Sequence, residues 1–195
     1  MLNSQGFDLW AEGYDKSVQQ SDEDHSYPFA GYRQVLNTVY QKIRTHAGKS
    51  VLDVGFGTGI LAQKLYQDGY RITGLDFSDQ MLAIAKEKMP DASLYRHDFS
   101  AGYPDFLQAE AFDFIVCTYA IHHLEDPQKL RLINALFSHL SAGGLLLIGD
   151  VAFESAAEQD ACRSKYEDEW DEDEFYMVNE GLQPSLPHMT FEKIS

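Results

Sequence analysis

The sequence predicts an α/β domain in which helices cover both faces of a doubly wound, mostly parallel sheet, giving a three-layer α/β/α sandwich. Short apolar runs alternate with segments of helical periodicity through the centre of the chain, and this alternation is typical of parallel sheets. The 195 residues match the size of one domain, and 44% hydrophobic with 24% charged residues is ordinary for a globular protein.

The first expected helix covers residues 29–47, where apolar side chains recur three and four residues apart. These apolar positions are Val35, Leu36, Val39, Tyr40 and Ile43. Gly48 ends the helical pattern. The apolar run 50–54 then predicts a short buried strand, which leads into a glycine-rich turn.

A second helix is expected to begin at Ile60 and to end at Gly69. The segment 71–76 predicts the second strand. Ser78 is a good N-cap for a third helix that runs through Met89 and is closed by a proline.

Residues 94–97 and 112–118 predict the third and fourth strands. Asp126 is expected to cap the next helix, with Pro127 at its first helical position. The helical pattern continues to Leu140.

The end of the chain is less regular. Residues 144–151 predict a fifth strand, whereas residues 154–180 hold eleven acidic residues against Arg163 and Lys165. This acidic stretch predicts one helix, or a helix with a mobile segment. Residues 189–194 are expected to begin a further strand.

The chain thus divides into an N-terminal lid and helix (1–47), a core (48–151) and an acidic helical segment with the start of a strand (152–195), all within one domain, 1–195. The formal charge of −16 disfavours nucleic acid and anionic membranes as partners. Two cysteines without metal-binding spacing, no leader and no run of the roughly 20 apolar residues that span a bilayer indicate a cytoplasmic protein. The oligomeric state stays open.

The strongest motif places glycines 55, 57 and 59 between a strand and a helix. Glycines in such a turn let the backbone approach a ligand closely. A dinucleotide site needs a small residue at position 60, which is Ile60, and an acidic residue, Asp53, precedes the first glycine by two positions. A pyrophosphate would be repelled by this carboxylate, whereas an ammonium or sulfonium group would be attracted.

Further polar residues follow the next strands. Asp76 ends the second strand and can accept hydrogen bonds from both hydroxyls of a ribose, while Phe77 can lie against a purine. Asp98, after the third strand, can accept a hydrogen bond from an adenine amino group. Carboxyl ends of parallel strands meet at one edge of a sheet, so these groups should share one site.

Together these motifs resemble those of the class I S-adenosylmethionine-dependent methyltransferases, particularly the bacterial small-molecule enzymes, over residues 7–151. The segment 7–15 resembles the entrance segment of that family, in which Tyr14 would close over the methionine part of the cofactor. The resemblance implies a Rossmann-like fold, S-adenosyl-L-methionine as cofactor and S-adenosyl-L-homocysteine as product. It also implies methyl transfer to a small-molecule acceptor by in-line displacement.

The resemblance assigns roles along the chain. The glycines and Asp53 would hold the methionine part, Asp76 the ribose, and Phe77, Asp98 and Phe99 the adenine. Tyr119 and Ala120 would lie under the sulfonium. The full set implied for the cofactor is Tyr14, Asp53, Gly55, Phe56, Gly57, Thr58, Gly59, Asp76, Phe77, Met81, Asp98, Phe99, Tyr119 and Ala120.

His122, at the substrate side, and Tyr119 would position the acceptor or accept its proton. No metal site is expected, because neighbouring residues such as His122 and His123 usually point apart and no third ligand has a recognised spacing. The acidic run 167–174 is expected to form a solvent-exposed face. Phe56 is bulkier than the usual residue of the family.

The family's sheet normally ends in an antiparallel hairpin, and a chain stopping at Ser195 is expected to lack the final strand. A cofactor-binding module or regulatory subunit without catalysis is the alternative. A nicotinamide dehydrogenase is disfavoured by Ile60, and aminopropyl transfer on the same fold stays open.

Overall fold

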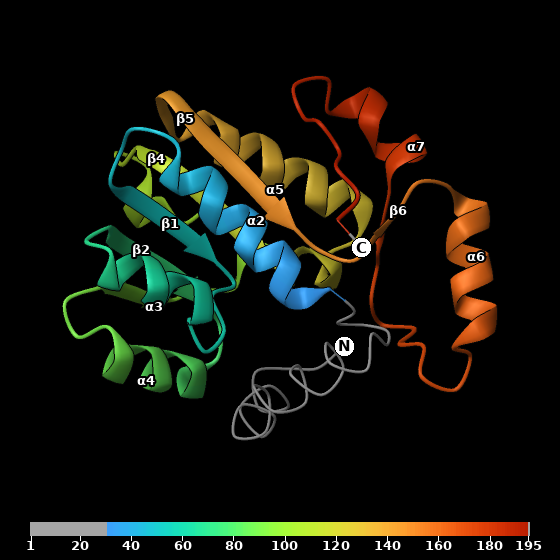
Figure 1. The fold of residues 1–195 in the computed structure, drawn as a ribbon, viewed down its shortest axis with the longest axis horizontal. Coiled ribbons are helices and arrows are strands. Elements are labelled where there is room, and N and C mark those ends of the chain that lie inside the picture. The colour runs from blue at the N-terminus through green and yellow to red at the C-terminus, as the bar shows by residue number, and fades with distance from the viewer. Residues whose placement is uncertain (1–30, 195) are drawn as a thin grey trace.

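The computed structural model describes residues 31–194, and its central feature is a five-stranded sheet in the order β3-β2-β1-β4-β5 (Figure 1). All four neighbouring pairs are parallel. The strands are β1 (Ser50–Val54), β2 (Arg71–Asp76), β3 (Ser93–Arg96), β4 (Phe112–Thr118) and β5 (Leu140–Gly149). The predicted doubly wound α/β fold is therefore confirmed.

The strand order reverses between β1 and β4. From β1 the chain continues to β2 and β3 on one side, whereas β4 and β5 lie on the other. Parallel sheets leave a crevice at such a reversal, beyond the carboxyl ends of the two strands. The glycine-rich turn follows β1, and the segment with the paired histidines follows β4, so both border this crevice.

Helices cover both faces of the sheet (Figure 1). One layer consists of α2 (Tyr32–Arg44), α3 (Ile60–Gln67) and α4 (Asp79–Lys88), whose apolar sides pack on Val51, Phe114 and Val116. On the other face α5 (Asp126–Ser138) packs on Leu52 and Ile115. Consecutive buried residues of the central strands β1 and β4 thus supply two separate cores, which is why these strands are apolar on both faces.

The local signals at the helix starts are partly confirmed. The Ser78 hydroxyl accepts a hydrogen bond from the Met81 N–H at 3.2 Å, as an N-cap should. At α5 the N-cap is Glu125 rather than Asp126, with a reciprocal capping box to Gln128, so Pro127 is the second helical residue.

The predicted end of α5 and start of β5 are wrong. The helix stops at Ser138, and Leu140 already pairs with Phe112 in the sheet. The register then shifts before Phe114 pairs with Leu145, and Gly143 takes a φ of 77° in the intervening bulge. The apolar run that predicts only 144–151 is therefore the second part of a longer strand.

The C-terminal part forms a small structure beside the main sheet. In it β6 (Ala152–Phe153) pairs in parallel with β7 (Met177–Val178), and α6 (Ala156–Lys165) connects them. A short helix, α7 (Asn179–Leu182), follows and packs Leu182 into the α5 layer. The acidic stretch, expected to be one helix or a helix with a mobile segment, thus holds a helix between two short strands.

The strand expected at residues 189–194 is wrong, because this stretch has no regular secondary structure in the described part of the chain. Its apolar residues are held by side-chain packing instead: Met189 contacts the α5 layer, and Ile194 packs near Val35 and Tyr119. Within residues 31–194, no helix has both the length and the apolar character that a membrane span requires.

Gly74 in β2 is a position where close packing requires glycine. A Cβ there would lie 2.6 Å from Cδ1 of Phe56 and 2.7 Å from Cδ2 of Leu94. We expect Gly74→Ala to lower the free energy of unfolding by about 1–3 kcal/mol, as overpacking does. Urea denaturation measures the change. Gly181→Ala, whose Cβ would meet nothing within 4 Å, is the control, and equal losses in both variants would contradict the packing argument.

Candidate functional site

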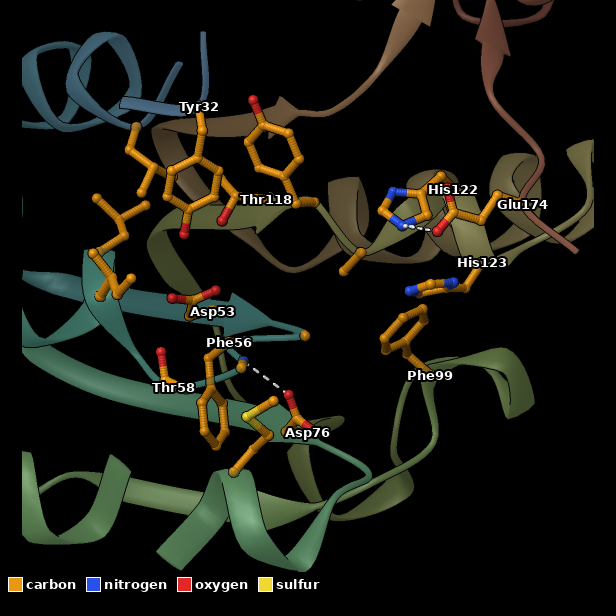
Figure 2. Close-up of a pocket in the computed structure, with 18 residues that line it drawn as sticks. Tyr32, Asp53, Phe56, Thr58, Asp76, Phe99, Thr118, His122, His123 and Glu174 are labelled. Carbon is orange, nitrogen blue, oxygen red and sulfur yellow. Dashed lines mark hydrogen bonds and ion pairs between the residues drawn. The ribbon is translucent and has the colours of Figure 1, made fainter. Parts of the chain in front are cut away.

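A pocket lies at the carboxyl ends of the central strands, where the strand order reverses (Figure 2). Eleven of the residues that the sequence singles out line it: Asp53, Gly55, Phe56, Gly57, Thr58, Asp76, Met81, Phe99, Tyr119, Ala120 and His122. The sheet topology explains this gathering, because the segments after β1, β2 and β4 end at one edge.

Hydrogen bonds fix the glycine-rich turn after β1. The Gly55 N–H donates to the Leu75 carbonyl at 2.7 Å, which ties the turn to β2. Gly57 has a φ of 56°, and a Cβ built on it would meet nothing within 4 Å. The turn therefore presents bare backbone to the pocket, as a ligand that contacts the main chain would need.

Asp76 ends β2 and holds this turn in place. Its Oδ2 accepts the Gly57 N–H at 2.8 Å, and its Oδ1 accepts the Ser78 N–H at 2.9 Å. A carboxylate has about four acceptor sites, which is more than these two amides use. Asp76 thus faces the pocket in an orientation that two backbone amides determine (Figure 2).

Asp53 is the least satisfied polar residue of the pocket. Its side chain is buried, and its Oδ1 has no hydrogen-bond partner among residues 31–194. Burial, and next the charge of Asp76, raises the pKa of Asp53 to about 7. A cationic group placed here would supply the missing partner and favour the ionised carboxylate.

Three predicted residues lie outside the pocket lining, and Tyr14 lies outside the described residues. Gly59 is the N-cap of α3, with a φ of 76°. Asp98 is exposed, and its Oδ1 accepts the Ser100 N–H at 2.9 Å, which caps a short 3-10 turn. The backbone carbonyl of Phe77 accepts a hydrogen bond from Arg96 Nε.

Tyr119 follows β4 in a left-handed conformation with a φ of 49°. It is the one non-glycine residue of the described chain with positive φ, a conformation that costs on the order of 1–3 kcal/mol. Its N–H donates to the Gly149 carbonyl at 2.8 Å, and its ring lies 4.8 Å from that of Tyr32 in α2. The turn brings Ala120 against Gly55, closing the floor of the pocket.

His122 is buried and paired with Asp150, which follows β5. The two side chains approach to 2.6 Å between Nδ1 and Oδ1. Since the ionised carboxylate only accepts, Nδ1 carries the proton, and Nε2 faces Glu174 at 3.7 Å (Figure 2). Burial alone would lower the pKa of His122, but Asp150 and then Glu174 outweigh it and raise the pKa above its ordinary value.

His123 and Glu174 complete this end of the pocket. The expectation that the two imidazoles point apart is wrong, because their ring centroids lie 4.2 Å apart. Both histidines belong to the short 3-10 turn Ile121–His123. Burial, and next the charge of His122, lowers the pKa of His123 to about 3.

Sequence reasoning misses Asp150 and Glu174. Asp150 could have been found, because it follows β5 at the same edge as the other polar residues. Its Oδ2 accepts the backbone amides of residues 120, 121 and 122 at 3.0–3.3 Å, so it shapes the whole turn. No sequence pattern distinguishes Glu174, because it is one of many acidic residues in its segment.

Comparisons with known proteins agree with this geometry. A methyltransferase domain model matches residues 51–144. An uncharacterized methyltransferase of Anoxybacillus flavithermus is 40% identical over 147 residues, covering 75% of this chain and 66% of that protein. One of Bacillus thuringiensis is 39% identical over 158 residues, covering 80% and 68%. The chain thus spans slightly less than two thirds of the Anoxybacillus relative's length.

Solved structures show the same fold. The complex of DhpI with SAH has a TM-score of 0.69 at 17% identity and covers 98% of this chain and 89% of its own. SAM-bound CalS10, an amino pentose methyltransferase of Micromonospora echinaspora, has a TM-score of 0.52 at 25% identity. That match covers 64% of this chain and 56% of CalS10.

Proposed function

The chain belongs to the class I S-adenosylmethionine-dependent methyltransferases, and from this premise we propose that it transfers a methyl group from S-adenosylmethionine to a small-molecule acceptor. The observation that carries the proposal is the buried Asp53 carboxylate beside the glycine-rich turn, with one oxygen unpartnered among residues 31–194. The ammonium of the cofactor's methionine part would be its partner.

The residues of the pocket fit the other parts of the cofactor. Asp76, already oriented by two backbone amides, would accept hydrogen bonds from the ribose hydroxyls. Phe99 and Met81 offer apolar contacts to the adenine, and Ala120 would lie near the sulfonium. The bare backbone of Gly57 leaves room for close approach.

The cofactor supplies a methyl group on a positively charged sulfur, which is activated without help from the protein. The protein would hold the acceptor in line with the carbon–sulfur bond and exclude water. His122 borders the pocket at the acceptor end, and Asp150 fixes its orientation there. Tyr119 would position the acceptor between these two parts.

The residues that border the pocket support a small acceptor. Residues of α2 and of the segment that carries Glu174 border the pocket together with the strand ends. The formal charge of −16 disfavours nucleic acids as acceptors. CalS10, whose structure resembles this one, is an amino pentose methyltransferase involved in calicheamicin biosynthesis.

Calorimetric titration tests the cofactor assignment, with S-adenosylmethionine and S-adenosylhomocysteine as ligands and NAD as control. We expect both sulfur compounds to bind one site and NAD to be silent. A folded protein that binds neither would contradict the proposal. Release of label from methyl-labelled cofactor with candidate acceptors then separates an enzyme from a binding module without catalysis.

The affinity for S-adenosylhomocysteine is expected to rise with pH up to about 7 and to level off above it. Asp53 has a pKa of about 7 in the free protein, and the ligand's ammonium would stabilise its ionised form. Binding below this pH must therefore release a proton, while binding above it releases none.

Calorimetry at pH 6 and pH 8 in buffers of different ionisation enthalpy measures this proton release. Asp53→Asn, which cannot ionise, is the control and should bind more weakly without proton release. A wild-type affinity that does not change between the two pH values would contradict the role of Asp53.

A further inference from the structure

Three side chains of metal-ligating type converge at the acceptor end of the pocket (Figure 2). His122 and His123 come from the turn after β4, whereas Glu174 comes from the segment before β7. Their ligand atoms all lie within 4.8 Å of one another, and His122 Nε2 lies 3.7 Å from Glu174 Oε1. Side chains so distant in sequence meet here because the C-terminal segment folds over the pocket.

The separations suit a single ion after a small closure. Zinc binds histidine nitrogen and carboxylate oxygen at about 2.0–2.2 Å in tetrahedral geometry, so two ligand atoms on one ion lie roughly 3.3–3.6 Å apart. His122 Nε2 and Glu174 Oε1, 3.7 Å apart, are already close to this spacing, and the other separations, all within 4.8 Å, exceed it by about 1 Å at most. Side-chain rotation alone could bring the three groups together.

The surroundings of the cluster hold its members in the orientation that a metal needs. Asp150 accepts the Nδ1 proton of His122 at 2.6 Å, so Nε2 is the nitrogen that faces the cluster and that would bind a metal in exchange for its proton. Tyr176 donates its hydroxyl to the other oxygen of Glu174. A carboxylate behind a ligating histidine is the usual outer partner in metal sites, and it raises the basicity of the ligand.

The charges also favour a cation. Asp150 and Glu174 bring two carboxylates to this end of the pocket, and His122 lies between them. The backbone joins the two segments firmly, because the Phe175 N–H donates to the His122 carbonyl at 2.7 Å. The cluster is therefore anchored from both sides rather than formed by loose surface groups.

We propose that His122, His123 and Glu174 bind one divalent transition-metal ion. Two imidazoles and one carboxylate are the donor set of Zn²⁺ and Fe²⁺ sites, whereas Mg²⁺ and Ca²⁺ prefer oxygen donors. Three protein ligands leave coordination positions open, and the cluster borders the pocket. No metal site is expected from the sequence because neighbouring imidazoles usually point apart, but the two ring centroids lie only 4.2 Å apart.

The inference deepens the proposed function by indicating the class of acceptor, and it rests on that function. An ion at this place would take an acceptor oxygen as a further ligand and lower the pKa of its hydroxyl. The hydroxyl proton would pass to solvent. The oxygen lone pair would then form the bond to the methyl carbon, while the electrons of the broken carbon–sulfur bond stay on sulfur. The acceptor class that such an ion would activate is a hydroxyl compound.

Metal titration of the tag-free protein, after treatment with a chelator, tests the site directly. We expect one equivalent of Zn²⁺ in calorimetry, and Co²⁺ to give visible absorption bands of a nitrogen- and oxygen-ligated ion. His123→Gln and Glu174→Gln should each weaken Zn²⁺ binding by about 10-fold or more. S-adenosylhomocysteine titrations of the same samples report the cofactor site separately.

His188→Gln and Glu169→Gln are matched controls, because both side chains are exposed and lie outside the cluster. They should bind Zn²⁺ as the wild type does. Zn²⁺ affinity unchanged in both site variants would overturn the proposal, and so would no Zn²⁺ binding by protein that still binds S-adenosylhomocysteine. Zn²⁺ binding without cofactor binding would support the metal site and count against the proposed function alone.

Discussion

Asp76→Ala is expected to lower the affinity for S-adenosylhomocysteine by at least about 100-fold. Two hydrogen bonds from ribose hydroxyls to the ionised carboxylate would be lost, and such bonds contribute about 1.5–3 kcal/mol each. A loss of 1.4 kcal/mol is a tenfold change in affinity, so the pair accounts for the expected effect. The variant also leaves the Gly57 and Ser78 amides without their carboxylate partner.

Calorimetric titration with S-adenosylhomocysteine measures the loss, and circular dichroism confirms that the variant is folded. Asp79→Ala is the matched control, because this aspartate lies three residues away at the start of α4 and its side chain is 68% exposed, paired with Arg96. It should bind the ligand as the wild type does. Tight binding retained in folded Asp76→Ala would remove the ribose role from this carboxylate.

Gly57→Val is expected to abolish measurable binding of S-adenosylhomocysteine. The new side chain would project into the open space over the turn, where the ligand must approach the backbone. The positive φ of 56° adds strain of about 1–2 kcal/mol, as a left-handed conformation does for residues with a Cβ. Stability should fall moderately, whereas affinity should fall below detection.

Gly69→Val separates these two effects. Gly69 follows α3 with a φ of 83°, and a Cβ there also meets nothing within 4 Å, but it does not line the pocket. We expect the two variants to lose similar free energies of unfolding in urea, with the ligand affinity lost only in Gly57→Val. Equal affinities in the two variants would place the ligand away from the turn.

The cofactor end of the pocket could be predicted from the sequence because its residues lie in short, ordered motifs. Asp53, Gly57 and Asp76 stand at the ends of consecutive strands, and parallel topology alone brings such ends together. The apolar periodicity also predicts the helix and strand layers. The predicted ends of helices and strands are wrong where strand pairing outweighs a local helical pattern. Leu140 continues a helical pattern, yet it pairs with Phe112 in the sheet.

The acceptor end could not be predicted, because its contacts join residues that are far apart in the sequence. Glu174 faces His122 only because β7 pairs with β6 and the Phe175 amide bonds to the His122 carbonyl. Nothing local distinguishes this glutamate from its acidic neighbours. For Asp98 the sequence prediction does not match the observed contact. Its position after a strand predicts a ligand contact, whereas in the structure its side chain caps a short turn.

The cofactor end and the acceptor end of the pocket depend on different parts of the chain, so acceptor specificity can change without loss of cofactor binding. The cofactor end is formed by residues between Asp53 and Ala120, so it depends little on residues beyond 150. The segment that carries Glu174 touches the pocket from outside the main sheet. A chimera that replaces residues 166–178 by the equivalent segment of a relative should therefore exchange acceptor preference while S-adenosylhomocysteine affinity stays the same.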